Sequence, residues 1–208
     1  CGERDGSGDG EAHVLILAGR DVHAEPLRYR RRMRSGFVAV AGRPNVGKST
    51  LVNALCGAKV AIVSDKPQTT RRRIFGVANG PDFQLVLADL PGFQRPLDPL
   101  TERMQRTVDQ AFDDVDAAVL VLDCRQRIGA GDRFVARRIF ELGVPVVIVL
   151  NKVDRLKPGH IVTQMQTASQ LGDFKALHPV SARTGDGVGE LRDELVALLP
   201  EGPRYFPE

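Results

Sequence analysis

Short apolar runs alternate with amphipathic segments along the chain from Phe37 onward. The runs have the length of strands and mostly end at Gly, Asp or Asn, and the segments between them space their apolar residues as a helix does. Strands that alternate with helices predict an α/β fold with a mostly parallel central sheet and helices on both faces. The expected strands are Phe37–Ala41, Phe83–Ala88, Ala117–Leu122, Pro145–Leu150 and Ala176–Val180, with Arg73–Val77 as an antiparallel edge strand.

The last four parallel strands carry Leu or β-branched residues on both faces, which is typical of strands buried inside a sheet. No internal repeat is visible, which excludes a tandem double domain. Ligands bind at the carboxyl ends of the strands in such sheets, so candidate chemistry should lie where strands end. The helices are expected at Lys48–Cys56, Leu100–Phe112, Asp132–Leu142, Ile161–Leu171 and Val188–Leu199.

The first 34 residues differ in composition from the rest. Residues 1–10 are rich in Gly and Asp, and Arg28–Arg34 is basic. The basic run could contact RNA or a membrane, but we favour a disordered tail or an upstream reading frame, because the chain begins with Cys and Met33 stands just before the ordered pattern. The expected organisation is an extension over 1–34, a domain over 35–202 and the start of a linker over 203–208.

Composition places the chain among ordinary globular proteins. Of 208 residues, 42% are hydrophobic and 26% charged, and 29 Lys and Arg against 26 Asp and Glu give a net charge of +3. This charge is too small to indicate a nucleic-acid partner, and an aromatic content of 5% with no Trp disfavours a surface that stacks bases. The three cysteines are scattered without CxxC spacing, so we expect neither a disulfide framework nor a zinc site.

A glycine-rich motif follows the strand Phe37–Ala41. It reads GRPNVGKST and matches GxxxxGK[ST], the phosphate-binding loop, at the junction of strand and helix that this motif requires. Its backbone N–H groups can converge on phosphate oxygens, Lys48 can bind the β- and γ-phosphates, and the Ser49 hydroxyl can coordinate Mg²⁺. The motif predicts a P-loop NTPase whose phosphate contacts come from Gly42, Arg43, Pro44, Asn45, Val46, Gly47, Lys48, Ser49 and Thr50.

The sequence Asn-Lys-Val-Asp directly follows the strand Pro145–Leu150 and indicates which base is bound. The Asp154 carboxylate can accept hydrogen bonds from N1–H and the 2-amino group of guanine, which adenine lacks. Asn151 can bridge the phosphate loop and guanine N7, and the Lys152 stem can cover the purine face. The expected ligand is therefore a guanine nucleotide, GTP or GDP.

Two segments complete the expected pocket. Ser181 and Ala182 follow the last strand, where a backbone N–H can reach guanine O6. Asp-Leu-Pro-Gly ends the strand Phe83–Ala88, where Asp89 can hold Mg²⁺ through water and the Gly92 N–H can bind the γ-phosphate.

A threonine between these motifs can coordinate Mg²⁺ in the triphosphate state alone. It lies in the polar run Pro67–Arg73, and we assign Thr70, with Thr69 as the alternative. The order of the elements along the chain favours this role over a plain surface loop.

With these elements in order, the sequence resembles the translation-factor-type GTPases, and among them the Era family. GRPNVGKST and NKVD are shared with the Der and MnmE families, which are the nearest alternatives. The stretch AIVSDKPQTTR from Ala61 to Arg71 and the closing LPEGP at Leu199–Pro203 are more specific to the Era family. The resemblance covers about residues 35–208. It implies a Ras-like G domain that hydrolyses GTP with Mg²⁺ and acts in assembly of the small ribosomal subunit (30S) and maturation of 16S rRNA.

The resemblance also carries expectations about context. Members of the family continue into an RNA-binding KH domain, which we expect to be absent because the chain stops at Glu208. A monomer in the cytoplasm, with weak association at the inner face of the cell membrane, is further implied. The family usually has Thr where this chain has Leu90, which leaves the contacts of Asp89 and Gly92 in place.

Phe93 stands where many GTPases place a Gln that orients the attacking water. Phenylalanine cannot form that hydrogen bond, so we expect slow intrinsic hydrolysis. In the GTPases that this chain resembles, the residue matching Asn45 helps to hold a K⁺ ion against the phosphates, so we expect stimulation by K⁺. The catalytic set is thus Lys48, Thr70, Gly92 and Asn45, and Leu90, Pro91 and Phe93 belong to the nucleotide contacts.

Two other functions stay open at this point. The first is an ATP-using kinase or ATPase with the same phosphate loop, against which Asp154 argues. The second is a nucleotide-dependent binding module with negligible hydrolysis, which Phe93 and the expected lack of an RNA domain would suit.

Overall fold

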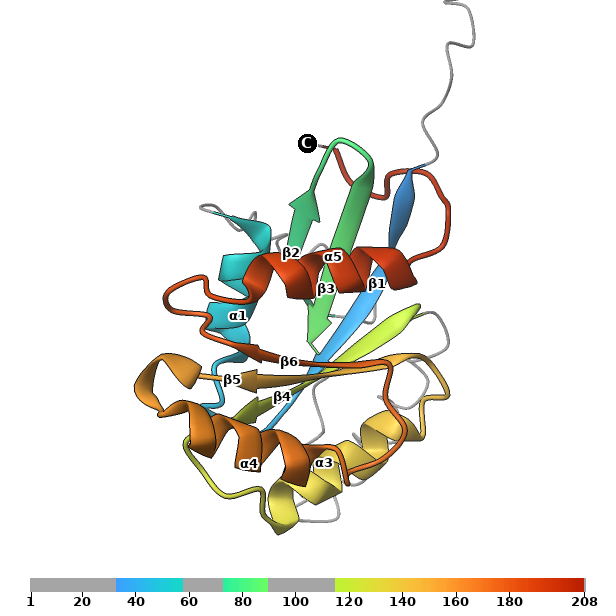
Figure 1. The fold of residues 1–208 in the computed structure, drawn as a ribbon. Coiled ribbons are helices and arrows are strands. Elements are labelled where there is room, and N and C mark those ends of the chain that lie inside the picture. The colour runs from blue at the N-terminus through green and yellow to red at the C-terminus, as the bar shows by residue number, and fades with distance from the viewer. Residues whose placement is uncertain (1–32, 58–72, 90–114, 208) are drawn as a thin grey trace, which may run out of the picture. The chain divides into compact units, whose positions relative to one another are not determined.

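A single sheet organises the part of the chain that the computed structural model describes, residues 33–57, 73–89 and 115–207. Its strands are β1 (Arg34–Ala41), β2 (Arg73–Asn79), β3 (Phe83–Asp89), β4 (Ala117–Asp123), β5 (Val146–Asn151) and β6 (Ala176–Val180). They lie in the order β2-β3-β1-β4-β5-β6 (Figure 1). All neighbours are parallel except β2 and β3, which are antiparallel with a bulge between Ile74 and Gly76. The predicted α/β fold and its antiparallel edge strand are confirmed.

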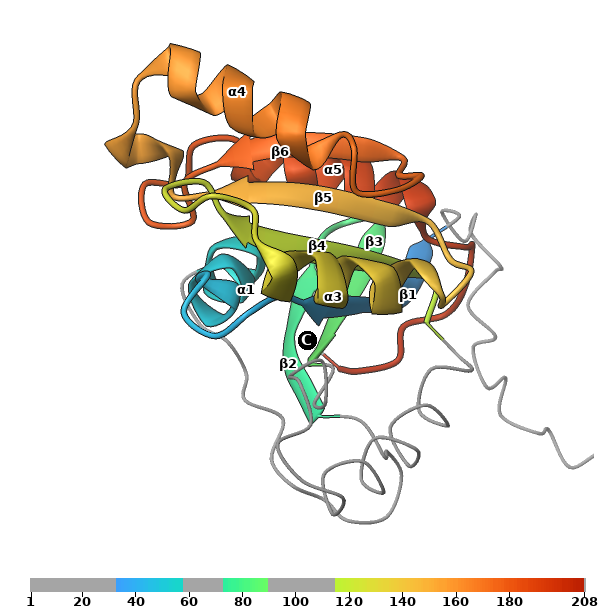
Figure 2. The same ribbon diagram turned by 90° about the horizontal axis from the view of Figure 1, so that it is seen from below.

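Helices cover both faces of this sheet (Figures 1 and 2). They are α1 (Lys48–Cys56), α3 (Ala130–Phe140), α4 (Pro158–Ala168) and α5 (Val188–Leu198), with a short 3₁₀ turn η1 (Val153–Arg155). The apolar sides of α1 and α5 pack on one face, and those of α3 and α4 pack on the other. Because side chains alternate along a strand, β4 and β5 supply apolar residues to both layers, and every residue of these two strands is buried.

Two helices begin earlier than their apolar spacing predicts. Helix α3 starts at Ala130 because the Asp132 carboxylate reaches back to accept the Gly129 N–H at 2.9 Å, which caps the first turn from inside the helix. Helix α4 starts at Pro158, whose fixed φ and missing N–H suit a first helical position. The predicted helix Leu100–Phe112 lies outside the described residues.

Strand β6 lies at the edge of the sheet, and the prediction that it is buried like its neighbours is wrong. Four of its five residues are half-buried, and Val180 is the one fully buried position. Pro179 lacks an N–H, which suits an edge strand with one hydrogen-bonded neighbour. Among the strands that the structure describes, it pairs with β5 alone.

Residues after α5 run back along the sheet to the start of β1 and β3. The Ser35 hydroxyl donates to the Pro203 carbonyl at 2.7 Å, and the Phe37 and Tyr205 rings lie with centroids 4.8 Å apart. Gln84, fully buried, accepts the Tyr205 and Phe206 N–H groups at 2.7 and 2.9 Å and donates to the Phe206 carbonyl at 2.8 Å. We call residues 203–207 the C-terminal strap.

The carboxyl ends of the parallel strands meet at one edge of the sheet. In register, Val40 lies beside Asp89, Asp123 beside Asn151, and Asn151 beside Val180. The loops that follow these positions therefore converge, as the sequence predicts for a ligand site. Within the described ranges, no helix is long and apolar enough to cross a bilayer.

Candidate nucleotide-binding site

The phosphate loop joins β1 to α1 through backbone that most residues disfavour. Gly42 and Gly47 have φ of 153° and 101°, and Asn45 is left-handed at 63°. Gly47 caps α1, so the free N–H groups of the helix start face the loop. The Lys48 ammonium donates to the Gly42 and Arg43 carbonyls at 2.8 and 3.0 Å, which lays this side chain across the loop. This geometry is that of an anion-binding loop at a helix N-terminus.

Asn151, at the end of β5, connects the phosphate loop to the loop after β6. Its side-chain amide donates to the Val46 carbonyl at 2.9 Å, as the sequence suggests for a bridge to the loop. Its Oδ1 accepts the backbone N–H groups of Lys152 at 2.8 Å and Ala182 at 3.0 Å. The Ala182 N–H is thus engaged by Asn151, and its bond to guanine O6 stays a prediction.

Lys152 has left-handed backbone with φ of 71°, which turns its side chain toward the phosphate loop. Its ammonium donates to the Asn45 carbonyl and lies 2.8 Å from Asp123 Oδ2. The aliphatic stem, between this backbone and the bound ammonium, lies along the wall of a cavity. A stem held in this way can cover a flat ring.

Asp154 lies in η1 and carries two oriented hydrogen bonds. The Ser181 hydroxyl donates to Oδ1 at 2.8 Å, and the Arg183 guanidinium donates to Oδ2 at 2.8 Å. The Ser181 hydrogen bond, followed by the charge of Arg183, holds the pKa of Asp154 below its usual range. The carboxylate is therefore ionised at neutral pH, and Ser181 fixes its orientation. Both properties suit a group that accepts hydrogen bonds from guanine N–H donors.

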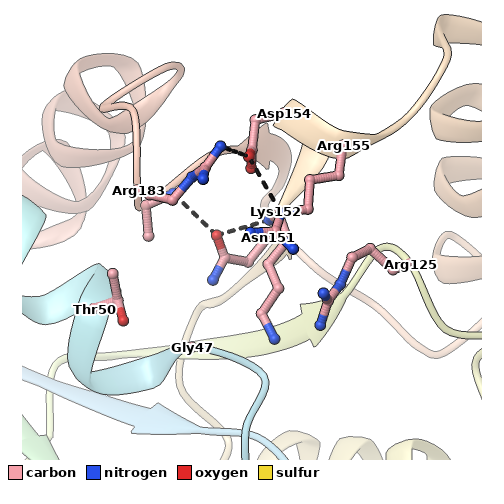
Figure 3. A pocket seen from close by; sticks show the side chains of 9 residues that line it. Gly47, Thr50, Arg125, Asn151, Lys152, Asp154, Arg155 and Arg183 are labelled. Carbon is pink, nitrogen blue, oxygen red and sulfur yellow. Dashed lines mark hydrogen bonds and ion pairs between the residues drawn. The ribbon is translucent and has the colours of Figure 1, made fainter.

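These groups surround a cavity of about 420 Å³ at the carboxyl edge of the sheet. Figure 3 shows Arg183 pointing to Asp154 and the Lys152 and Arg125 side chains directed to the same side of the site. The size suits a small organic ligand, and the lining combines one side-chain amide, one carboxylate and several cations. The cavity is lined by Gly47, Thr50, Arg125, Asn151, Lys152, Asp154, Arg155, Ala182 and Arg183.

Of the metal ligands predicted from the sequence, the structure describes Ser49 and the backbone of Asp89. Ser49, at the start of α1, is exposed and can offer its hydroxyl to Mg²⁺ beside the phosphate loop. The backbone of Asp89 lies at the end of β3, next to Val40 of β1. No cluster of three or more His, Cys, Asp or Glu exists among the described residues. A single hydroxyl beside a phosphate loop fits Mg²⁺, which keeps several waters and takes its other ligands from phosphates.

The switch residues of the prediction are outside the described part of the chain. Thr69, Thr70, Leu90, Pro91, Gly92 and Phe93 belong to this group.

The structure adds Asp123, Arg125 and Arg183 to the residues that the sequence pattern singled out. Asp123 ends β4 and pairs with Lys152, and Arg183 pairs with Asp154. A single Asp after an apolar run is common in turns, so local pattern does not distinguish it. Its position one strand away from Asn151 would have been the one available signal.

Comparison with known families agrees with this geometry. The sequence profile described as 50S ribosome-binding GTPase matches residues 37–152, more than half of the chain. The chain belongs to this family of P-loop GTPases.

Within that family, the chain is similar to proteins named GTPase Era. It is 42% identical over 176 residues to the protein from Heliobacterium modesticaldum and 40% identical over 174 residues to that from Alkaliphilus metalliredigens. These matches cover 85% and 84% of this chain and 59% of each relative. The chain thus spans about three fifths of the length of its curated relatives.

Solved structures give the same result. A crystal structure of Era in complex with MgGDPNP and nucleotides 1506–1542 of 16S ribosomal RNA superposes with a TM-score of 0.70 at 34% identity, over 84% of this chain and 60% of that one. A variant of Aquifex aeolicus Era bound to GDP·AlF₄⁻ also has a TM-score of 0.70, at 31% identity, over the same shares. The cytosolic domain of the Thermotoga maritima FeoB iron transporter is more distant, with a TM-score of 0.57 at 27% identity, over 78% of this chain and 63% of that one.

Proposed function

We propose that this chain is the GTP-binding and GTP-hydrolysing domain of a molecular switch of the Era type. The observation that carries the proposal is the pair of contacts around the 420 Å³ cavity. Asn151 ties the base-side loop to the phosphate loop at Val46, and Ser181 orients Asp154. A guanine ring and a phosphate chain are thereby offered adjoining sites.

Guanine recognition would rest on Asp154. Its oxygens would accept N1–H and the 2-amino group, so the Arg183 guanidinium would have to leave Oδ2. The Lys152 stem would cover one face of the ring, and Asn151 would reach N7. Adenine would leave this carboxylate buried against the base without a donor, which is costly.

The phosphate chain would lie in the loop 42–50. Its backbone N–H groups and the Lys48 ammonium would bind the β- and γ-phosphates, and Ser49 would hold Mg²⁺ together with Asp89 and Thr70. Mg²⁺ would neutralise phosphate charge. Asn45, exposed and left-handed, would be the residue that places K⁺ beside the phosphates. The reaction would be GTP + H₂O → GDP + phosphate, slow without an activator because Phe93 cannot orient water.

Binding is tested with a fluorescent GDP analogue in Mg²⁺ buffer. We expect unlabelled GDP and GTP to displace it and ATP to fail at concentrations about a hundred times higher, while Lys48→Ala abolishes tight binding. Displacement by ATP as effective as by GTP would contradict the guanine assignment.

Hydrolysis needs its own experiment. Single-turnover measurements with radiolabelled GTP should give slow phosphate release that is faster in K⁺ than in Na⁺ at matched ionic strength. Equal rates in both salts would remove the K⁺ proposal alone. Tight GTP binding with no phosphate release in either salt would instead make the chain a nucleotide-dependent binding module.

We further propose that the whole protein acts in 30S assembly and 16S rRNA maturation. The support is the similarity to the Era structure that holds a segment of 16S rRNA. In cells depleted of the protein, we expect immature 16S rRNA to accumulate and the wild-type gene, but not Lys48→Ala, to restore maturation. A monomeric state and weak association with the inner membrane face stay predictions, to be tested by sedimentation and by vesicle flotation.

A further inference from the structure

Asp123 is the buried carboxylate at the centre of the carboxyl edge of the sheet. It ends β4, which lies between β1 and β5, and its register partner is Asn151. Its side chain is 2% exposed. A carboxylate that is buried to this extent needs partners that compensate its charge, and the identity of those partners indicates its role.

Two cations supply the partners. Arg125 binds in a fork, with Nε 3.0 Å from Oδ1 and Nη2 2.8 Å from Oδ2, and its backbone N–H donates to Oδ1 at 3.0 Å. Lys152 Nζ donates to Oδ2 at 2.8 Å. Burial opposes the charge of Asp123, but the hydrogen bonds from Arg125 and Lys152 outweigh it and lower the pKa to about 2.

The consequence of these contacts falls on Lys152. Its ammonium is held from two sides, by Asp123 and by the Asn45 carbonyl of the phosphate loop. A lysine side chain has several rotatable bonds and otherwise points freely into water. With its backbone fixed after β5 and its ammonium fixed by these two contacts, the stem keeps one path along the wall of the cavity that Gly47 and Asp154 also line.

We propose that Asp123 is a positioning residue for nucleotide affinity: clamped by Arg125, it fixes the Lys152 ammonium on the phosphate loop and so holds the lysine stem where the guanine ring would lie. This inference rests on the proposed guanine-nucleotide function. Asp123 acts through Lys152 and itself stays beneath the ligand.

A double-mutant cycle tests this dependence. Asp123→Asn and Lys152→Ala are made singly and together, and the affinity for a fluorescent GDP analogue is measured beside thermal unfolding. We expect Asp123→Asn to weaken GDP binding by roughly tenfold, because the Lys152 ammonium would lose its buried anionic partner and the stem would no longer be held in one place. In the Lys152→Ala background, the same substitution should change GDP affinity by less than about twofold, since the residue it acts through is gone.

The matched control is Asp116→Asn. Asp116 directly precedes β4, at the opposite end of that strand from Asp123. Asp116 accepts the Phe37 N–H at 2.7 Å, far from the cavity, and an asparagine oxygen can still accept it, so removing this charge should leave GDP affinity unchanged. If Asp123→Asn does not fold, Arg125→Met keeps the carboxylate but removes the fork. It should weaken GDP binding in the wild-type background and not in Lys152→Ala.

The outcomes distinguish failure of the positioning role of Asp123 from failure of the proposed guanine-nucleotide function. Equal losses of GDP affinity in both backgrounds, or a folded Asp123→Asn variant with wild-type affinity, would overturn the positioning role while leaving the GTPase assignment standing. A wild-type chain that binds no guanine nucleotide would overturn both.

Discussion

The Asn151 side-chain amide donates to the Val46 backbone carbonyl at 2.9 Å and so joins two loops that lie 105 positions apart in sequence. Both groups are buried, and the same side chain accepts the Ala182 N–H. One amide therefore holds together the two halves of the cavity.

Replacing Asn151 with Ala should separate those halves. The Val46 carbonyl and the Ala182 N–H would lose their partner while buried, which costs about 1–3 kcal/mol of unfolding free energy. GDP affinity should fall as well, since both loops line its site. Urea unfolding and GDP titration measure the two effects. The control Asn53→Ala, on the exposed side of α1, should change neither quantity. An Asn151→Ala variant with wild-type stability and GDP affinity would show that the bridge is dispensable.

Gly47→Ala should disrupt the same junction from the other side. Gly47 has φ of 101°, and a Cβ there would lie 2.3 Å from Asn151 Nδ2. The backbone strain alone costs roughly 1–2 kcal/mol, and the amide bridge would also have to move. We expect a lower melting temperature and loss of GDP binding. Gly189→Ala in α5 meets no atom within 4 Å and should be neutral or stabilising, by up to about 1 kcal/mol.

Asp154→Asn should change which base is preferred. Xanthine carries a carbonyl oxygen where guanine has its 2-amino group, and an asparagine amide can donate to it. The ratio of XDP to GDP affinity should rise by at least about a hundredfold, as measured by competition against a fluorescent nucleotide. Asp186→Asn, an exposed neighbour in the same loop region, should leave the ratio at its wild-type value. A ratio that did not move would reassign base recognition to another residue.

The low pKa of Asp123 predicts how stability depends on pH. Since the pKa is about 2 in the folded protein and 3.8 is its reference value, the charged form favours folding. That contribution is complete above about pH 4 and is lost as the pH falls toward about 2. The difference in unfolding free energy between wild type and Asp123→Asn should therefore be constant from about pH 7 to 5 and shrink below about 4. Denaturant unfolding at each pH measures it, and a difference that grew in acid would contradict the sign.

Gln84→Leu should release the C-terminal strap. The substitution keeps the size of a fully buried side chain but leaves the backbone groups of Tyr205 and Phe206 without their partner. We expect a loss of about 1–3 kcal/mol and faster proteolysis after α5. Gln166→Leu on the exposed side of α4 is the control, and equal protease resistance of the two variants would show that Gln84 does not hold the C-terminal strap.

The phosphate loop and the NKVD segment could be predicted from the sequence. In each, residue types that suit binding of phosphate or guanine stand directly after a predicted strand. The strands were found within a few residues of their observed ends, since buried runs of Val, Leu and Ile have few other uses. What escaped prediction depends on long-range contacts. Asp123 finds Lys152 from 29 positions away, and Gln84 finds Phe206 from 122 away.

Each error in the predicted elements has an identifiable cause. Helix α3 begins at Ala130, two residues before the predicted start at Asp132. Asp132 caps the helix from its third position, and the spacing of apolar residues does not reveal such a cap. Strand β6 was predicted to be buried from its apolar residues, although Pro179 within it indicates an edge strand.

The strap on Gln84 determines where this chain can be cut. A fragment that ended at Gly202 would keep all the helices and strands of the described residues, yet Gln84 would lose three of its hydrogen bonds and Phe37 its ring partner Tyr205. The smallest fragment to express for binding or crystallisation work therefore extends to Phe206. Any segment fused after it would leave from beside the start of β3, at the opposite end of that strand from Asp89.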